Sequence, residues 1–223
     1  MTTPSYNASP LAPRVRRGGF VLIDPATETV ERVIAFQYNP ESLSRSLQAR
    51  GAGEGGDRNE ALRLTGPPVE SISLEAELDA TDQLEFPDDN ETVVQVGLHA
   101  QLAALESVLY PSLETLVSNH ERAARGELEI IPAQAPLVLF VWGRSRVVPV
   151  RLSDFSVVEE GFDPDLNPLR VRISVNMTVL STNDLTFDSR GAGIYRVYHR
   201  TREQLAERMP MGAIDDLGLG EIP

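Results

Sequence analysis

Two segments of the chain alternate strictly between apolar and polar residues, and this pattern constrains the fold more than any other feature. In residues 71–79 and 169–179 every second side chain is apolar: Ile72, Leu74, Ala76 and Leu78, then Leu169, Val171, Ile173, Val175, Met177 and Val179. Successive side chains of a β-strand point to opposite faces of the sheet. Each segment therefore predicts a strand with one face in a core and the other against water or a polar neighbour.

Four further strands are expected in two hairpins. They lie at residues 19–24, 31–38, 137–142 and 147–158. The turns that join them are Asp24-Pro25-Ala26-Thr27 and Gly143-Arg144-Ser145. In the last strand the apolar phase shifts near Ser153-Asp154, which predicts a β-bulge. Proline lacks the amide hydrogen of a ladder, so the chain is expected to leave the sheet at Asn39-Pro40.

A leucine stripe predicts one dominant amphipathic helix over residues 91–110. Its apolar positions are Leu98, Leu102, Leu105 and Leu109, and the acidic run 88–91 suits the start of a helix. Pro111 ends or restarts the helix. Beyond it we expect a short second helix at 113–117, a connector at 118–136 and a short helix at 202–209. The glycine-rich stretch 49–60 predicts a loop.

About six strands and one dominant helix predict a mainly β (α+β) fold, a small antiparallel barrel or sandwich with the helix packed on its side or end. The chain is expected to divide into three parts. These are a flexible arm at 1–18, a β-barrel domain at 19–182 that contains the helix 91–110, and a C-terminal extension at 183–223 that docks on a neighbour.

Charge and composition exclude several function classes. The formal net charge is −13, and residues 51–100 carry twelve acidic and two basic side chains. Phosphate binding needs a basic patch, so nucleic acid is not an expected partner. The acidic segment suits either a solvated loop or a charge-matched protein partner. There is no cysteine, and all twenty basic residues are arginine, which pairs with carboxylates in bidentate fashion.

Targeting signals are also missing from the pattern. No apolar run reaches 18 residues, and residues 1–13 lack the basic and then apolar order of a signal peptide. We therefore expect no direct membrane insertion and a protein that stays in the cytoplasm unless a larger assembly, itself extracellular or cytoplasmic, carries it out.

Residues able to support catalysis or metal binding are sparse. His99, His120 and His199 are far apart and have no partner at a metal-ligand spacing, and the carboxylates between 79 and 89 lack the order of a calcium loop. No nucleophile elbow, Walker loop or dinucleotide fingerprint is present. We expect no enzyme activity, no cofactor and no metal, and we interpret Trp142 as a core or interface anchor.

Charged side chains on the polar faces of the two alternating strands have opposite signs. Glu75, Glu77 and Asp79 lie on one strand, and Arg170 and Arg172 on the other. They are complementary if these faces meet, either within one wall of the sheet or across a subunit boundary. We hypothesise that one such contact sets the register of a ring.

Several motifs in a fixed order resemble a known family. They are Phe36-Gln37-Tyr38-Asn39-Pro40-Glu41-Ser42-Leu43, Leu74 to Thr81, Pro136 to Trp142-Gly143, Val147 to Phe155 and Pro168 to Leu180. Together they resemble the tube-like N-terminal domain of the contractile injection system proteins that join the inner tube to the spike and baseplate. The resemblance covers about residues 19–181.

The resemblance implies a phage tail-tube-like β-barrel that assembles as a sixfold ring, with tube subunits and spike or baseplate proteins as partners. Loops around 39–66 and 158–168 would make axial contacts. Many relatives continue into a LysM module, but only about 30 residues follow Ile194 here, and the glycine-aspartate-threonine turn of that module is missing.

The leading hypothesis is a structural adaptor ring at the junction of tube and baseplate in a contractile injection particle. A main inner-tube subunit or tube initiator of the same particle is the first alternative. A glycan-binding or hydrolytic module of the particle is a second alternative, from another class.

Overall fold

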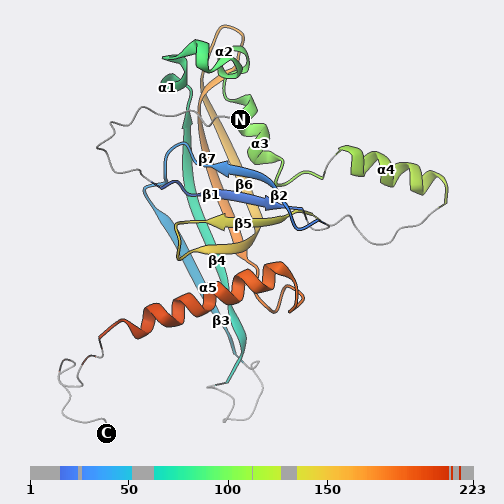
Figure 1. Cartoon of the computed structure of the whole chain (residues 1–223). Helices are drawn as coiled ribbons and strands as arrows, with labels where there is room; N and C mark the ends of the chain where they lie inside the picture. The colour runs from blue at the N-terminus through green and yellow to red at the C-terminus, as the bar shows by residue number, and fades with distance from the viewer. Residues whose placement is uncertain are drawn as a thin grey trace.

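The protein is built on one antiparallel sheet with helices on one of its sides (Figure 1). A computed structural model describes residues 16–24, 27–51, 63–111, 113–126, 135–210, 212 and 216. The strands are β1 Gly19–Ile23, β2 Val30–Ala35, β3 Leu43–Gly51, β4 Leu64–Asp79, β5 Leu137–Val141, β6 Val147–Phe162 and β7 Pro168–Val179. The helices are α1 Thr81–Leu84, a 3-10 turn η2 Pro87–Asp89, α2 Glu91–Val96, α3 His99–Glu106, α4 Leu113–Ala124 and α5 Arg190–Glu207.

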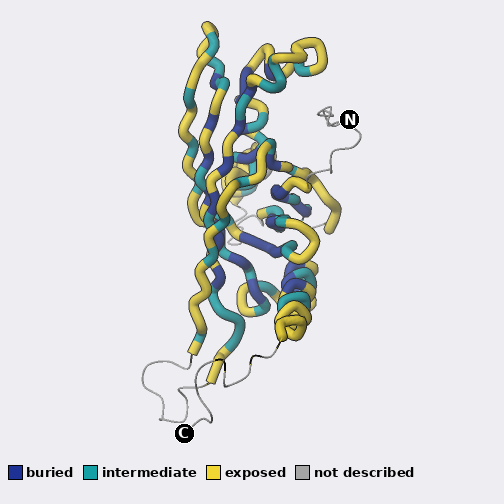
Figure 2. The backbone as a smooth tube through the Cα atoms, turned by 90° about the vertical axis from the view of Figure 1, so that its left-hand side faces the viewer, coloured by how far each residue is buried: buried dark blue, intermediate teal, exposed yellow. Residues whose placement is uncertain are grey.

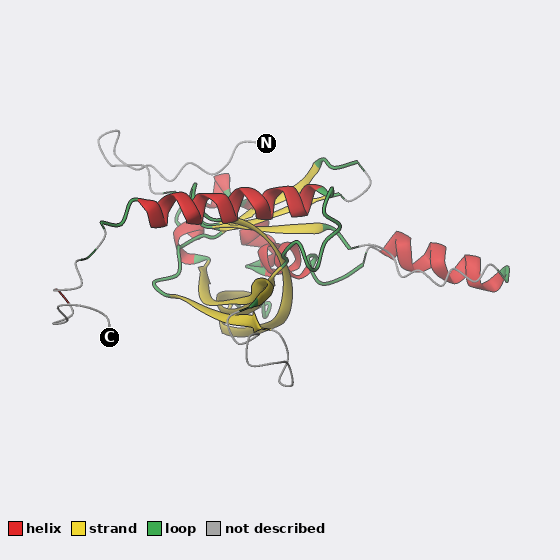
Figure 3. Ribbon diagram, turned by 90° about the horizontal axis from the view of Figure 1, so that it is seen from below, coloured by secondary structure: helices red, strands yellow, loops and turns green. Residues whose placement is uncertain are grey.

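The sheet is open, so the predicted closed barrel is not found within the single chain. The strand order is β2-β1-β5-β6-β7-β4-β3, and within the described residues β2 and β3 form the two edges. Closure would require these edges to pair. The long strands β4, β6 and β7 extend well beyond the short β1, β2 and β5, and Figure 3 shows the sheet strongly curved. The mainly β class is confirmed.

The two alternating segments form neighbouring strands, as the pattern predicts. β4 pairs with β7 so that Leu74 lies opposite Val175 and Ala76 opposite Ile173. All four of these side chains are at most 4% exposed. Figure 2 shows buried residues alternating with exposed ones along these strands. The apolar faces of both strands form the centre of the core.

The predicted bulge in β6 is confirmed. Pairing with β7 shifts between Leu152 and Asp154, and after the shift Phe155 lies opposite Val175. The extra residue restores the apolar phase, so that Phe155 and Val157 pack against the core.

The single helix predicted at 91–110 is wrong, because Gly97 breaks it into α2 and α3. Gly97 has φ +54° and ψ −136°, a conformation that residues with a Cβ essentially never adopt. The break lets the amide of Leu98 donate to the carbonyl of Pro168, at 3.0 Å. The apolar stripe itself is correct for Leu98, Leu102 and Leu105, each at most 5% exposed.

Two other helices differ from the prediction. α4 extends to Ala124 through residues expected to be a connector, and it projects away from the sheet (Figures 1 and 3). The short helix predicted at 202–209 is the end of the 18-residue α5. Ser189 caps the start of α5, because its hydroxyl accepts a hydrogen bond from the amide of Ala192 at 3.3 Å. The glycines and arginines of its first turns hid the helical period.

α5 packs on the same face of the sheet as the other core helices. Tyr195 and Tyr198 are each 4% exposed and belong to the core cluster. The domain boundary at 182 and the docking of the extension on a neighbour stay predictions. Residues 1–15 of the predicted arm, 52–60 of the predicted loop, and 211, 213–215 and 217–223 of the extension lie outside the described residues.

Strand β3 was expected to be a loop. Its residues include Ser44, Arg45, Ser46, Gln48 and Arg50, and little apolar alternation marks such an edge strand. β3 pairs with β4, which starts at Leu64, before Pro67 and Pro68. The second strand of the first hairpin is shorter than predicted and ends at Ala35. In the described part of the chain no helix is long and apolar enough to cross a membrane.

Replacing Gly97 by alanine tests the helix break. Gly143 is the control, because its φ is +79° and an added Cβ meets nothing within 4 Å. At Gly97 an added Cβ would lie 2.6 Å from the carbonyl oxygen of Pro168. We expect Gly143→Ala to lower the free energy of unfolding by about 1–2 kcal/mol, and Gly97→Ala to lower it by at least ~1 kcal/mol more. Urea unfolding measures both, and equal losses would contradict the steric role of Gly97.

Candidate structural site on strand β4

The segment 36–40 fastens the first hairpin to the rest of the sheet. Phe36 is 4% exposed and meets Phe20 edge to face, with ring centroids 5.5 Å apart. Phe20 lies against Phe140, on which the ring of Trp142 stacks at 5.9 Å. Trp142 is therefore a partly buried anchor. The backbone amide of Trp142 also donates to the carbonyl of Arg146, and this hydrogen bond closes the turn at Gly143.

Asn39 holds the segment before β1. Its Oδ1 accepts from the amide of Gly18 at 2.8 Å, and its Nδ2 donates to the carbonyl of Arg16 at 2.7 Å. Pro40 follows, where the chain has left β2 and turns toward β3. An amide side chain that replaces a missing strand partner explains why asparagine suits this position.

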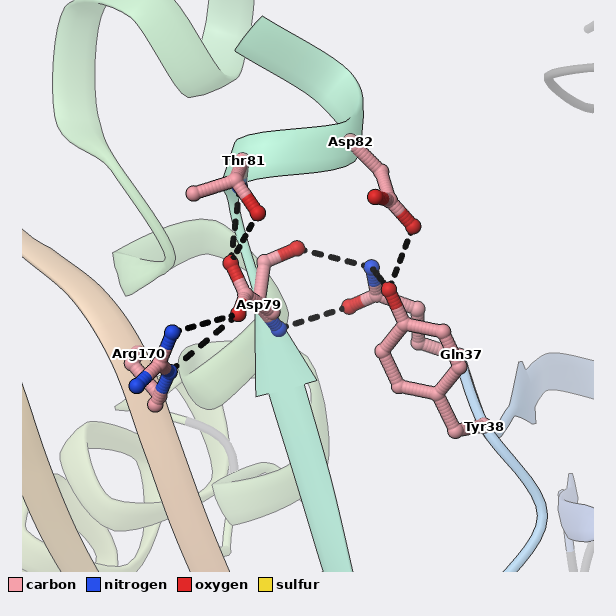
Figure 4. Close-up of polar contacts among 6 residues, drawn as sticks. All are labelled: Gln37, Tyr38, Asp79, Thr81, Asp82 and Arg170. Carbon is pink, nitrogen blue, oxygen red and sulfur yellow. Dashed lines mark hydrogen bonds and ion pairs between the residues drawn. The ribbon is translucent and has the colours of Figure 1, made fainter.

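Gln37 joins this segment to the end of β4 (Figure 4). Its Nε2 donates to the carbonyl of Asp79 at 2.7 Å, and its Oε1 accepts from the amide of Asp79 at 3.0 Å. The side chain thus binds the backbone of Asp79 as a paired strand would. Beside it, the hydroxyl of Tyr38 donates to the carboxylate of Asp82.

The carboxylate of Asp79 is the centre of this cluster. It accepts from the hydroxyl of Thr81 at 2.6 Å, from the amide of Thr81 at 2.9 Å, and from Nε of Arg170 at 3.2 Å. Burial raises the pKa of Asp79, but the hydrogen bonds from Thr81 and the charge of Arg170 together hold it below its ordinary value. Folding therefore favours the ionised form of the Asp79 carboxylate.

The predicted charged residues lie together on the polar face of one sheet. Asp79 is opposite Arg170 and Glu77 is opposite Arg172 in the β4–β7 register. Arg170 pairs with Asp79 at 3.1 Å, whereas Arg172 pairs with Glu160 of β6. The complementarity is thus realised inside one chain. Its role in ring register stays a prediction.

A second cluster, which the sequence did not suggest, surrounds Glu70. Glu70 is 2% exposed, and its carboxylate binds Nη2 of Arg45 at 2.7 Å and accepts from the hydroxyl of Tyr198 at 3.1 Å. Nη1 of Arg202 lies 3.5 Å from the same carboxylate. These contacts link β3, β4 and α5. Burial raises the pKa of Tyr198, and the charge of Glu70 raises it further, so the tyrosine keeps its proton and donates.

Within the described ranges no three histidine, aspartate or glutamate side chains gather where they could hold a metal ion. Both clusters consist of paired groups that connect strands and helices. Their arrangement suits a structural role, in which the pairs hold strands and helices in fixed positions.

The sequence pattern of one protein family, described as contractile injection system tube protein, matches residues 22–188. The chain belongs to this family of tube proteins. The match covers most of the chain and all of the sheet except the first residues of β1, and it stops just before α5. The tube-protein match thus includes the Asp79 cluster entirely, while the Glu70 cluster also takes in Tyr198 and Arg202 beyond the match.

Other comparisons are more distant. No curated protein matches the chain. Among solved structures, it is similar to a chain from the "Tail of empty GTA particle computed with helical refinement, C6 symmetry", at 9% identity and a TM-score of 0.28, over 72% of this chain and 90% of that one.

Acid titration tests the Asp79 cluster. A carboxylate whose pKa is lowered by folding adds stability above its unfolded pKa, here 3.8, and loses that contribution as the pH falls through the folded value. We expect wild type to be more stable than Asp79→Asn at pH 7, and the difference in unfolding free energy to shrink once the pH falls below about 4. Glu75→Gln, at an exposed position of the same strand, is the control. A difference that does not depend on pH would contradict the assignment.

The Glu70 cluster is tested by Glu70→Ala. The change leaves Arg45 and Tyr198 without their common acceptor, and we expect a loss of about 2–3 kcal/mol in the free energy of unfolding. Glu75→Ala, on the exposed face of the same strand, should stay within about 0.5 kcal/mol of wild type. Urea unfolding compares the two, and similar losses would argue against the cluster.

Proposed function

We propose that the protein is a structural adaptor subunit that forms a ring at the junction between the tube and the baseplate or spike of a contractile injection particle. The single observation that carries this proposal is the open sheet of a tube-family protein, in which β2 and β3 have no further strand beside them among the described residues. An unpaired edge strand presents amide and carbonyl groups to any neighbouring strand. Pairing of β2 of one copy with β3 of the next would complete the sheet and close a ring, for which the family resemblance implies sixfold symmetry.

The polar face of the sheet supports a tube-like role. Within the described residues α1, α2, α3 and α5 contribute to the core on the opposite face, and Figure 2 shows helices on one side of the long strands. The polar face carries a group of hydroxyl side chains, here called the hydroxyl face: Ser44, Ser46, Ser71, Ser73, Ser156, Ser174 and Thr178. A sheet face of this kind suits contact with water. In a ring it would line a hydrophilic passage.

A second observation, the exposed apolar stripe of helix α4, also supports assembly with other subunits. Leu113, Leu116 and Val117 form an apolar stripe and are 75%, 51% and 47% exposed. A helix of this length is marginal in water without a packing partner. In the particle α4 would pack on a neighbouring subunit as part of the lateral contact.

The charged residues next to the hydroxyl face would contribute to ring register. Asp79 and Arg172 are paired within the chain, whereas neither Glu75 nor Glu77 forms a direct ion pair in the described part of the chain. Both remain available to an arginine of the adjoining copy.

Localisation in purified particles tests the function. With a tag on this chain, electron microscopy should show label at one end of the tube, as one adaptor ring requires. An untagged strain and a strain with the sheath protein tagged are the controls. Label along the whole shaft would show a main tube subunit instead, and no label on the particle would overturn the proposal.

A further inference from the structure

The edge strand β3 is held weakly by its own side chains. None of its nine residues is buried, and Leu43 packs against the core cluster as a partly buried residue. In the described part of the chain β3 pairs with β4 alone, so one side of its backbone has no ladder partner there. A strand with so little burial is expected to open more easily than the central strands.

Helix α5 crosses the sheet and reaches this strand (Figure 1). Near its start Gly191 lies against β5, where an added Cβ would be 3.2 Å from Cδ1 of Leu137. Two turns later Tyr198 meets β3, because Nη2 of Arg45 donates to its hydroxyl at 3.3 Å. Both side chains bind the buried carboxylate of Glu70 on β4. α5 therefore connects a central strand with the edge.

The turn that precedes α5 touches the same β3–β4 hairpin at a second point. Oδ1 of Asp184 lies 3.6 Å from Nη2 of Arg50, near the end of β3. Asn183 lies against Gly66 of β4, where an added Cβ would be 2.5 Å from the Asn183 side-chain nitrogen. Arg50 and Gly66 are partners in the β3–β4 register. The residues that reach the hairpin from the C-terminal side are here called the C-terminal clamp: Asn183, Asp184, Tyr198 and Arg202.

We propose that the C-terminal clamp controls assembly by holding β3 against β4, so that the edge is ordered before a neighbouring copy pairs with it. The part that concerns assembly rests on the proposed function, because it assumes that β3 pairs across a subunit boundary. With the clamp released, β3 would open locally while the central strands stay folded. The apparent affinity for the neighbour would then fall by the fraction of copies in which β3 is ordered. Tyr198 and Arg202 are thus positioning residues that act on the subunit contact through β3.

Hydrogen exchange followed by mass spectrometry tests the local effect in the purified full chain. Tyr198→Phe with Arg202→Gln removes the hydroxyl and the cation that α5 contributes, whereas the buried ring remains. We expect the protected amides of residues 43–51 to exchange at least about ten times faster than in wild type. The amides of residues 169–179, in the central strand β7, should change by less than about twofold.

Tyr195→Phe with Arg200→Gln is the matched control. Both residues lie on α5, and neither belongs to the C-terminal clamp. In the control, exchange of residues 43–51 should stay within about twofold of wild type. Equal acceleration of residues 43–51 and 169–179 in the clamp variant would show a general loss of stability, and no acceleration would show that β3 does not depend on α5. Either result overturns the proposal.

Incorporation into particles tests the consequence for assembly. In a strain that makes only the clamp variant, the fraction of this chain that sediments with particles should fall at least about fivefold. The total amount of the chain in the lysate should stay equal to wild type, and the control variant should sediment as wild type does. Normal incorporation in spite of faster exchange in β3 would overturn the control of assembly.

The outcomes separate the clamp from the proposed function. Label of the tagged wild-type chain along the whole shaft would overturn the adaptor placement, whereas the exchange of β3 in the purified chain does not depend on that placement. A tagged chain at one end of the tube, together with unchanged exchange in β3, would leave the adaptor function standing and overturn the clamp.

Discussion

The pairing of β4 with β7 is the constraint on which the rest of the structure depends. Their alternation is in phase, so apolar side chains such as Leu74 and Val175 lie opposite each other on one face. A shift by one residue would move every apolar side chain of a strand to the polar face. Because the register is determined so strongly, the helices can bind only one face of the sheet, and the other face remains polar.

The two polar clusters extend this constraint to the surrounding elements. Gln37 binds the backbone of Asp79 where β4 ends, which ties the first hairpin to the far end of the long strands. Glu70 connects the edge strand β3 with α5 through Arg45 and Tyr198. A buried carboxylate is costly unless its partners are in place. Glu70, at 2% exposure, therefore favours one placement of the edge strand β3.

Part of this architecture was predictable from the sequence and part was not. The alternating strands, the bulge near Asp154 and the buried leucines of α3 follow from periodicity, which depends on neighbouring residues. The break at Gly97 was missed because the acidic run 88–91 indicated a helix start before it, whereas every leucine of the stripe lies after it. The cause of the break is the contact with Pro168. Glu70 was missed because Arg45, Tyr198 and Arg202 are far from it in sequence. Asp79 and Arg170 were correctly seen as complementary, but the sequence left open whether they met in one chain.

The strand type, the faces of β4 and β7, and the motifs of the tube-protein family can be read from the order of side chains along the chain. The open sheet, the edge strand at residues 43–51 and the long helix at residues 190–207 on the core became evident only in the folded protein. Edge strands and packed helices are stabilised by groups distant in sequence, and local periodicity carries little information about such contacts.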